Sequence, residues 1–209
     1  MSTEKQISFN SAEDRLQVAD QAVLDTEILT ALIESLSSDQ RRVRQFSAAA
    51  IKEVASREPK VLASYVPAIA DGLHRPEAQT RWECLEALSF IAPLNPEGLE
   101  EVIEGAETSL FDEESGMAHL AAMHFLCAYG ALSAKRAIMV WPLIEEGIQV
   151  YHGDPEFVDM LVSVECFAAG KIGQATKARL SARMEFDAKN YMGAVGRIAT
   201  HIVELCAKK

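Results

Sequence analysis

The stretch that decides the fold is VRQFSAAAIKEV, residues 43–54. Apolar or small side chains recur in it every three or four residues, at Val43, Ser47, Ala50, Ile51 and Val54. At about 100° per residue these positions fall on one side of an α-helix, and the charged residues fall elsewhere. A helix edge built from serine and alanine lets neighbouring helices approach closely. The stretch therefore predicts a helix that is packed inside a larger helical assembly.

The same spacing recurs along the chain, which indicates an internal repeat. Two successive steps of 37 residues lead to Thr80, Cys84, Ala87, Leu88 and Ile91, and to Met117, Ala121, His124, Phe125 and Ala128. Steps of 42 and 36 lead to Asp159, Ser163, Cys166, Phe167 and Gly170, and to Val195, Ala199, Ile202, Val203 and Cys206. We predict that these positions form the packed side of each helix.

Each of these segments follows a second apolar segment. VPAIADGL (66–73) and WPLIEEGI (141–148) align without a gap, while TALIESL (30–36) and EGAETSL (104–110) are looser versions. An Asp or Asn precedes most of the later segments and is suited to capping a helix start: Asp39, Asp112, Asp154 and Asn190. The repeating unit is therefore predicted to be a pair of helices.

The paired segments resemble the HEAT repeats, and more loosely the armadillo repeats. The resemblance rests on VRQFSAAAIKEV with its preceding Asp39 and on VPAIADGL with its proline, and it covers residues 26–207. Tetratricopeptide repeats, with a period of about 34 residues, are the structural rival. The resemblance implies an all-α fold, a right-handed α-α superhelix (HEAT-like solenoid) of about five helix pairs.

The repeats define a predicted domain organisation. Residues 12–209 are predicted to form a single HEAT-like repeat domain, in which residues 12–24 are a partial capping helix, and residues 1–11 are predicted to be a mobile tail. The five predicted repeats are 26–57, 59–93, 96–131, 134–170 and 175–207.

The composition excludes several classes of protein. The chain has 209 residues, 49% hydrophobic and 24% charged, which is typical of a folded globular protein. Cys84, Cys127, Cys166 and Cys206 are far apart and form no CxxC pair, so they indicate small core residues and no disulfide or zinc site. The N-terminal residues have no signal-peptide core, and no apolar run approaches the ~20 residues of a membrane helix. We expect a cytoplasmic protein without a membrane span, metal or cofactor.

Function in a repeat protein is expected on the exposed side of its helices. In HEAT proteins the second helices line the concave wall, so the side opposite the packed positions is the predicted partner-binding stripe. Its members are Trp82, Leu85, Glu86, His119, Met123, Leu126, Leu161, Val164 and Glu165. The stripe is apolar, which indicates either a groove for another protein or peptide, or a surface covered by the N-terminal segment or by a second copy in a homodimer.

Charge and the remaining polar residues favour binding over catalysis. Residues 1–165 hold 12 basic and 28 acidic residues, a net of −16, whereas 166–209 hold 8 and 3, a net of +5. The formal net charge of −11 disfavours nucleic acid, which requires a broad positive surface. His124 is predicted to be a core histidine, and His152 lies in an extended loop where a tolerated insertion is the simpler reading.

The interpretation is a non-catalytic protein-binding scaffold or adaptor. The alternative is an enzyme like the HEAT-like alkylpurine DNA glycosylases, which place aromatic residues and a carboxylate on the concave wall. Trp82, Trp141 and Asp159 are the residues that would take those roles. The negative charge and the lack of a matching motif disfavour this alternative.

Overall fold

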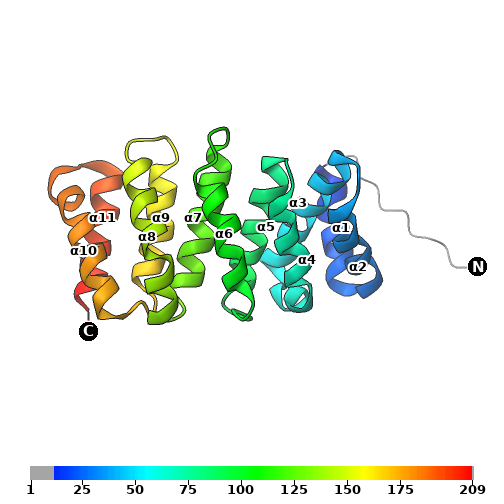
Figure 1. Cartoon of the computed structure of the whole chain (residues 1–209), viewed down its shortest axis with the longest axis horizontal. Helices are drawn as coiled ribbons and strands as arrows, with labels where there is room; N and C mark the ends of the chain where they lie inside the picture. Colours follow the sequence, from blue (N-terminus) through cyan, green and yellow to red (C-terminus); the bar gives the residue numbers. More distant parts are fainter. Residues whose placement is uncertain (1–11, 209) are drawn as a thin grey trace, which may run out of the picture. The chain divides into compact units, whose positions relative to one another are not determined.

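The structure is a computed structural model that describes residues 12–208, and the prediction for residues 1–11 lies outside the described residues. Within the described range every regular element is a helix, as predicted. The contacts divide the chain into two compact units, 1–105 (unit 1) and 106–209 (unit 2). Figure 1 colours the helices by their place in the sequence, from α1 in blue to α11 in red.

Unit 1 begins with a helix that packs on the first repeat. Its elements are α1 (Ala12–Leu24), α2 (Thr26–Glu34), η1 (Ser35–Ser37), α3 (Arg41–Arg57), η2 (Pro59–Tyr65), α4 (Val66–Asp71), η3 (Gly72–His74), α5 (Ala78–Ile91) and η4 (Leu99–Glu101). Helix α1 packs on α2 and α3, and α3 packs on α5. The helix predicted over 12–24 is therefore present, and it lies against the two helices of the first repeat.

Unit 2 continues the same pattern of paired helices. The division between the units falls within α6 (Val102–Leu110). The later elements are α7 (Gly116–Gly130), α8 (Ala134–Val150), α9 (Phe157–Ala168), α10 (Gly173–Asn190) and α11 (Gly193–Ala207). Helix α7 packs on both α8 and α9, α9 packs on α11, and α10 packs on α11. The five predicted helix pairs are α2–α3, α4–α5, α6–α7, α8–α9 and α10–α11.

The packed positions predicted in α5 are confirmed, and those in α3 and α11 are confirmed except for Val43, Val195 and Val203, which are half-buried. Ser47, Ala50, Ile51 and Val54 of α3 are buried, and all five predicted positions of α5 are buried. In α11 the buried positions include Ala199, Ile202 and Cys206. The run of three alanines in α3, Ala48 to Ala50, is completely enclosed. Small side chains are therefore what allow α1 and α5 to approach α3 from two sides.

The register predicted for α7 and α9 is wrong by one residue, which is about 100° around each helix. Met117 is exposed and His124 is half-buried, while the buried side of α7 consists of Ala118, Ala121, Ala122, Phe125 and Leu126. In α9, Asp159 and Cys166 are exposed, while Met160, Leu161, Val164, Phe167 and Ala168 are buried. The segment MAHLAAMHFLCA is apolar on all sides, so several registers fit it equally well. The positions predicted in α9 lie 42 residues after those in α7, so they have the same error in register.

The helix starts predicted at Glu77 for α5 and at Glu156 for α9 are confirmed, but the Asp and Asn caps predicted for the other helices are wrong. Helix α3 begins after Gln40, α7 after Ser115, α9 after Glu156 and α11 after Met192. The Ser115 side chain accepts a hydrogen bond from the backbone N–H of Ala118, which caps α7 in place of Asp112. Asp112 lies earlier in the loop, where Oδ1 accepts from the backbone N–H of Glu114 at 2.9 Å. Local loop geometry therefore selects the cap, and a nearby acidic residue is not sufficient.

Candidate protein-binding face

Five members of the predicted stripe lie in the interior. Leu85, Met123, Leu126, Leu161 and Val164 are completely buried, so they present no surface to a partner. Met123 shows the reason, because its Cε fills the space beside Gly147 of α8, where a Cβ on that glycine would lie only 2.4 Å away. These residues hold neighbouring helices together, and their assignment to an exposed stripe is wrong.

The four polar or aromatic members keep some exposure but do not form one surface. Trp82 and Glu86 are half-buried on α5 of unit 1, one turn apart. Glu165 is half-buried on α9 and pairs with His201 of α11, with its Oε1 2.5 Å from Nδ1. His119 lies on a different side of α7, where its ring stacks on Tyr151 with centroids 4.4 Å apart. His119 is therefore part of the packing between α7 and the end of α8.

The solvent side of α7 and α9 combines apolar and polar residues that are exposed or half-buried, and we name it the α7–α9 face. Its members are Met117, Leu120 and His124 on α7, and Asp159, Val162 and Cys166 on α9. The residues of each set recur every three or four positions, which places them on one side of their helix. Met117 is 51% exposed and Val162 is 44% exposed. Because α7 and α9 pack directly on each other, the two sets lie on neighbouring helices.

One feature of the sequence indicates this face, although the repeat register that begins at Met117 does not reveal it. Ala118, Ala121, Ala122 and Phe125 repeat the small-small-apolar spacing of Ser47, Ala50, Ile51 and Val54. With Ala118 in the place of Ser47, Met117, Leu120 and His124 fall outside the packed side of α7. The neighbouring helix α11 presents polar residues instead, with Arg197, Thr200, His201 and Glu204 exposed.

The thiols differ strongly in their surroundings. Cys166 is exposed on the α7–α9 face, whereas Cys84, Cys127 and Cys206 are buried. Burial raises the pKa of the Cys84 thiol to about 12, and burial also raises the pKa of Cys127 well above its ordinary value. Cys166 is thus the accessible cysteine of the described residues, and it is a natural reporter for this face.

Around Trp82 of unit 1 the exposed surface is charged. Lys52 of α3 contacts Glu53 at 2.8 Å and Glu83 of α5 at 4.0 Å. Burial raises the pKa of the Glu83 carboxyl, while Lys52, Arg15 and the hydrogen bond with Trp82 act against that shift. Trp82 therefore lies among groups of both signs, and this surface is more polar than the α7–α9 face.

The described surface has a groove in each unit. The larger, about 500 Å³, lies in unit 1 between α4 and the residues from Asn95 to Gly105, and Asp71, His74, Glu97 and Glu101 give it a polar rim. The other, about 430 Å³, lies in unit 2 at the start of α11 and is bordered by Tyr191, Met192, Arg197 and His201. Neither groove includes a residue of the predicted stripe.

One residue of the enzymatic alternative, Trp141, lies in the interior. Trp141 is buried within unit 2 and stacks on Phe167 with centroids 6.5 Å apart, so it cannot stack on a base. Among residues 12–208 no three His, Cys, Asp or Glu side chains are placed to bind one metal ion. Over the same range, each helix is too short or too polar to span a bilayer.

Comparison with known proteins gives structural likeness only. No protein-family model and no curated protein matches the sequence. A designed armadillo repeat protein in complex with the peptide (KR)4 has a TM-score of 0.74 at 16% identity, covering 93% of this chain and 90% of that one. Another designed armadillo repeat protein has a TM-score of 0.69 at 15% identity, covering 95% and 96%. An archaeal HEAT-like repeats protein from Thermococcus onnurineus NA1 has a TM-score of 0.55 at 11% identity, covering 92% of each chain.

These likenesses agree with the paired helices and with the buried small residues of α3 and α5. They also agree with the resemblance carried by residues 43–54 and 66–73. The chain therefore has the all-α helical-repeat solenoid fold shared by armadillo and HEAT-like repeat proteins.

Proposed function

We propose that the chain is a non-catalytic protein-binding scaffold whose α7–α9 face takes an apolar segment of another protein. The observation that carries the proposal is the presence of exposed apolar side chains on two adjacent helices, Met117 on α7 and Val162 on α9, with Leu120 half-buried beside Met117. Exposed apolar patches cost free energy in water, and on soluble proteins they mark interaction sites. A methionine at the edge of such a patch adapts to different side chains.

The chemistry at one edge of the face suggests the character of the partner. Glu113 and Glu114 are exposed just before α7, and Asp159 is exposed in the first turn of α9. These carboxylates therefore lie at the N-terminal ends of α7 and α9, which are neighbouring helices. We expect a bound segment with an apolar anchor and a basic residue near this acidic edge.

Two further observations support binding as the general role. The structurally similar designed armadillo repeat protein was captured with a basic peptide, (KR)4, and this chain carries a net charge of −11. In unit 1, Trp82 and Glu86 are half-buried on α5 and remain candidate contacts of their own. Tryptophan contributes large contact area at interfaces, so Trp82 is the residue of unit 1 to test.

The test compares two valines of similar exposure in unit 2. Val162 is 44% exposed on the α7–α9 face, and Val150 is 53% exposed at the end of α8. The full chain is used as the bait in three forms: the parent chain, Val162→Glu and Val150→Glu. Proteins captured by each form are cross-linked to it and identified by mass spectrometry. We expect the same captured protein with the parent and with Val150→Glu, and its loss with Val162→Glu. Equal capture by both variants would contradict the proposal for this face.

Cys166 provides a direct footprint of binding. Its thiol is exposed on the α7–α9 face, so a docked segment would cover it. We expect Cys166 to be alkylated more slowly in the complex than in the unbound chain. In the unfolded chain, the rate of alkylation should be the same with and without the partner. A complex that forms with Cys166 still reacting at the rate of the unbound chain would place the partner elsewhere.

A further inference from the structure

One end of the chain presents an acidic and apolar helix face. On α1 the exposed residues recur at helical spacing as Glu13, Leu16, Gln17, Asp20, Gln21 and Leu24. Leu24 is 89% exposed where α1 meets α2. We call this set the α1 face. Residues 12–36 hold one basic and six acidic residues, a net of −5.

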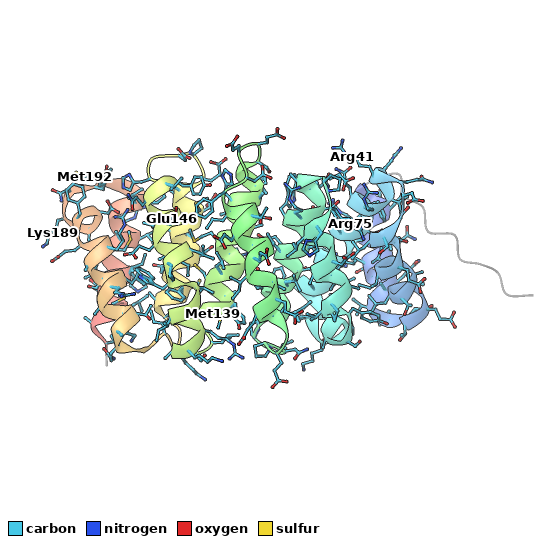
Figure 2. The ribbon with its side chains drawn as sticks, in the orientation of Figure 1. Arg41, Arg75, Met139, Glu146, Lys189 and Met192 are labelled. Carbon is cyan, nitrogen blue, oxygen red and sulfur yellow. The ribbon has the colours of Figure 1, made fainter. Side chains whose placement is uncertain are left out.

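The opposite charge is found on α10. Arg179, Ala182, Arg183 and Phe186 share one side of this helix, and we call them, together with Met192 in the following turn, the α10 face. Phe186 is 62% exposed and Met192 is 93% exposed. In Figure 2, Lys189 and Met192 project outwards from the α10–α11 pair.

Both arginines of the α10 face and one of the two acidic residues of the α1 face, Glu13, lack an ion pair among the described residues. Within residues 12–208, Arg179 and Arg183 make no ion pair, and neither do Glu13 and Glu27 beside the α1 face. Asp20 pairs with Arg57, and Lys189 pairs with Glu185 at 2.7 Å. The α10 face therefore combines exposed apolar side chains with two unpaired arginines, and the α1 face combines them with unpaired Glu13, beside unpaired Glu27 of α2.

We propose that the α1 face of one copy docks on the α10 face of a second copy, head to tail. Leu16 and Leu24 would cover Phe186 and Met192, while Glu13 and Glu27 would approach Arg179 and Arg183. Opposite charges favour this pairing and oppose a symmetric contact between two α10 faces, which would bring arginines together. The occupant is thus a second copy of this chain, identified by the complementarity of its own two faces.

This contact has a structural consequence that distinguishes it from an ordinary dimer. A head-to-tail interface uses two different surfaces, so each bound copy leaves one surface of each kind open. The assembly therefore grows with concentration, into a ring or an open chain. One helix face on each side is a small area compared with the roughly 800 Å² per partner of a stable interface, so association is expected to be weak and salt-sensitive.

The first measurement is sedimentation velocity of the full chain over a wide concentration range. We expect the average mass to rise with concentration at low salt, and the rise to shrink at high salt because the charges are screened. A monomer at every concentration would overturn the proposal.

Mixing two blocked variants tests the head-to-tail arrangement. One variant carries Leu16→Ser and Leu24→Ser, and the other carries Phe186→Ser and Met192→Ser. We expect each variant alone to remain monomeric, and their mixture to form a dimer that grows no further, because each supplies the face that the other lacks. Self-association of either variant alone, at the level of the parent, would overturn this arrangement.

Controls separate the contact from damage to the fold. Ile138 of α8 is 61% exposed, which matches Phe186, and Ile138→Ser should leave association unchanged. Reversal of Arg179 and Arg183 to Glu should weaken association by about tenfold or more, and adding Glu13→Lys and Glu27→Lys should restore it. Failure of this restoration, with helix content unchanged by circular dichroism, would refute the charge complementarity. Val162→Glu should still self-associate, so this result is separate from the proposed function.

Discussion

His152, in the loop after α8, hydrogen-bonds to Asp187 of α10, with Nε2 3.1 Å from Oδ1. Asp187 is buried, and its second oxygen, Oδ2, has no partner among the described residues. The histidine ring also packs beside Phe157 and Tyr191, with centroids 4.8 and 5.1 Å apart. The loop that the sequence suggested to be a tolerated insertion thus joins two neighbouring helix pairs of unit 2.

Replacing His152 tests this connection. We expect His152→Ala to lower the free energy of unfolding by about 2 to 3 kcal/mol, because it leaves the buried Asp187 carboxylate without its hydrogen-bond donor. Urea denaturation of the full chain measures the change. His74→Ala, at an exposed histidine of unit 1, is the control and should change stability by less than about 0.5 kcal/mol. Equal effects of the two changes would show that the contact contributes nothing.

A second connection joins α3 and α5 in unit 1. Arg44 donates to both carboxylate oxygens of Glu77, with Nε 3.3 Å from Oε2, and it also donates to the Ser38 carbonyl oxygen at 2.7 Å. Burial acts to raise the pKa of Glu77, but the hydrogen bond and charge of Arg44 outweigh it, so the pKa lies below its ordinary value of 4.5. The ionised carboxylate is therefore the form that stabilises the fold.

This shift predicts how stability depends on pH. Because the folded-state pKa of Glu77 is lowered, its contribution is complete above about pH 4.5 and is lost as the pH falls through the folded-state value. We expect Glu77→Gln to cost about 2 kcal/mol at pH 7 and progressively less in acid. Urea denaturation of both chains from pH 7 down into the acid range gives the difference. A difference that stays constant with pH would contradict this account.

Gly170 lies where the loops on either side of α8–α9 touch. A Cβ at this position would be 2.6 Å from the carbonyl oxygen of Ala131, the same oxygen that accepts from the Lys171 N–H at 2.7 Å. Backbone atoms held by such a bond cannot rotate away as a flexible side chain would. We expect Gly170→Ala to destabilise the chain by about 2 kcal/mol in thermal or urea unfolding. Ala169→Ser, at the exposed neighbour, should change stability by less than about 0.5 kcal/mol.

The cysteines should react in a fixed order. The Cys84 thiol has a pKa of about 12, so only about one molecule in ten thousand carries its thiolate at pH 8. We expect iodoacetamide at pH 8 to modify Cys166 of the native chain, and to modify Cys84 and Cys127 only after denaturation. Peptide mass spectrometry identifies the modified positions, and a Cys166→Ser variant should lose the fast reaction. Modification of native Cys84 as fast as that of Cys166 would contradict its burial.

The helical-repeat fold was predictable from the sequence because its signal is local and repeated. Ser47, Ala50, Ile51 and Val54 share one helix face, and the same face returns in α5 and α11. The proline of VPAIADGL was predicted to mark a first helix, and Pro67 lies in the first turn of α4. There its missing N–H costs nothing. In WPLIEEGI the corresponding Pro142 lies inside the longer helix α8 instead.

The exposed surface was not predictable in the same way. Helices α7 and α9 are rich in apolar residues on all sides, so their sequences do not distinguish the buried side from the exposed one. Packing decides it, because Met123 fits against Gly147 and Phe167 fits against Gly130. Those contacts bury Leu126, Leu161 and Val164 and leave Met117 and Val162 outside.

The sequence by itself determined that the chain is a stack of helix pairs, since a periodic pattern of small and apolar residues specifies a helix face whatever surrounds it. Only the tertiary structure decided which face of α7 and α9 meets solvent, and that His152 reaches Asp187. Both depend on how side chains from distant positions fit one another, and no repeating spacing encodes that fit.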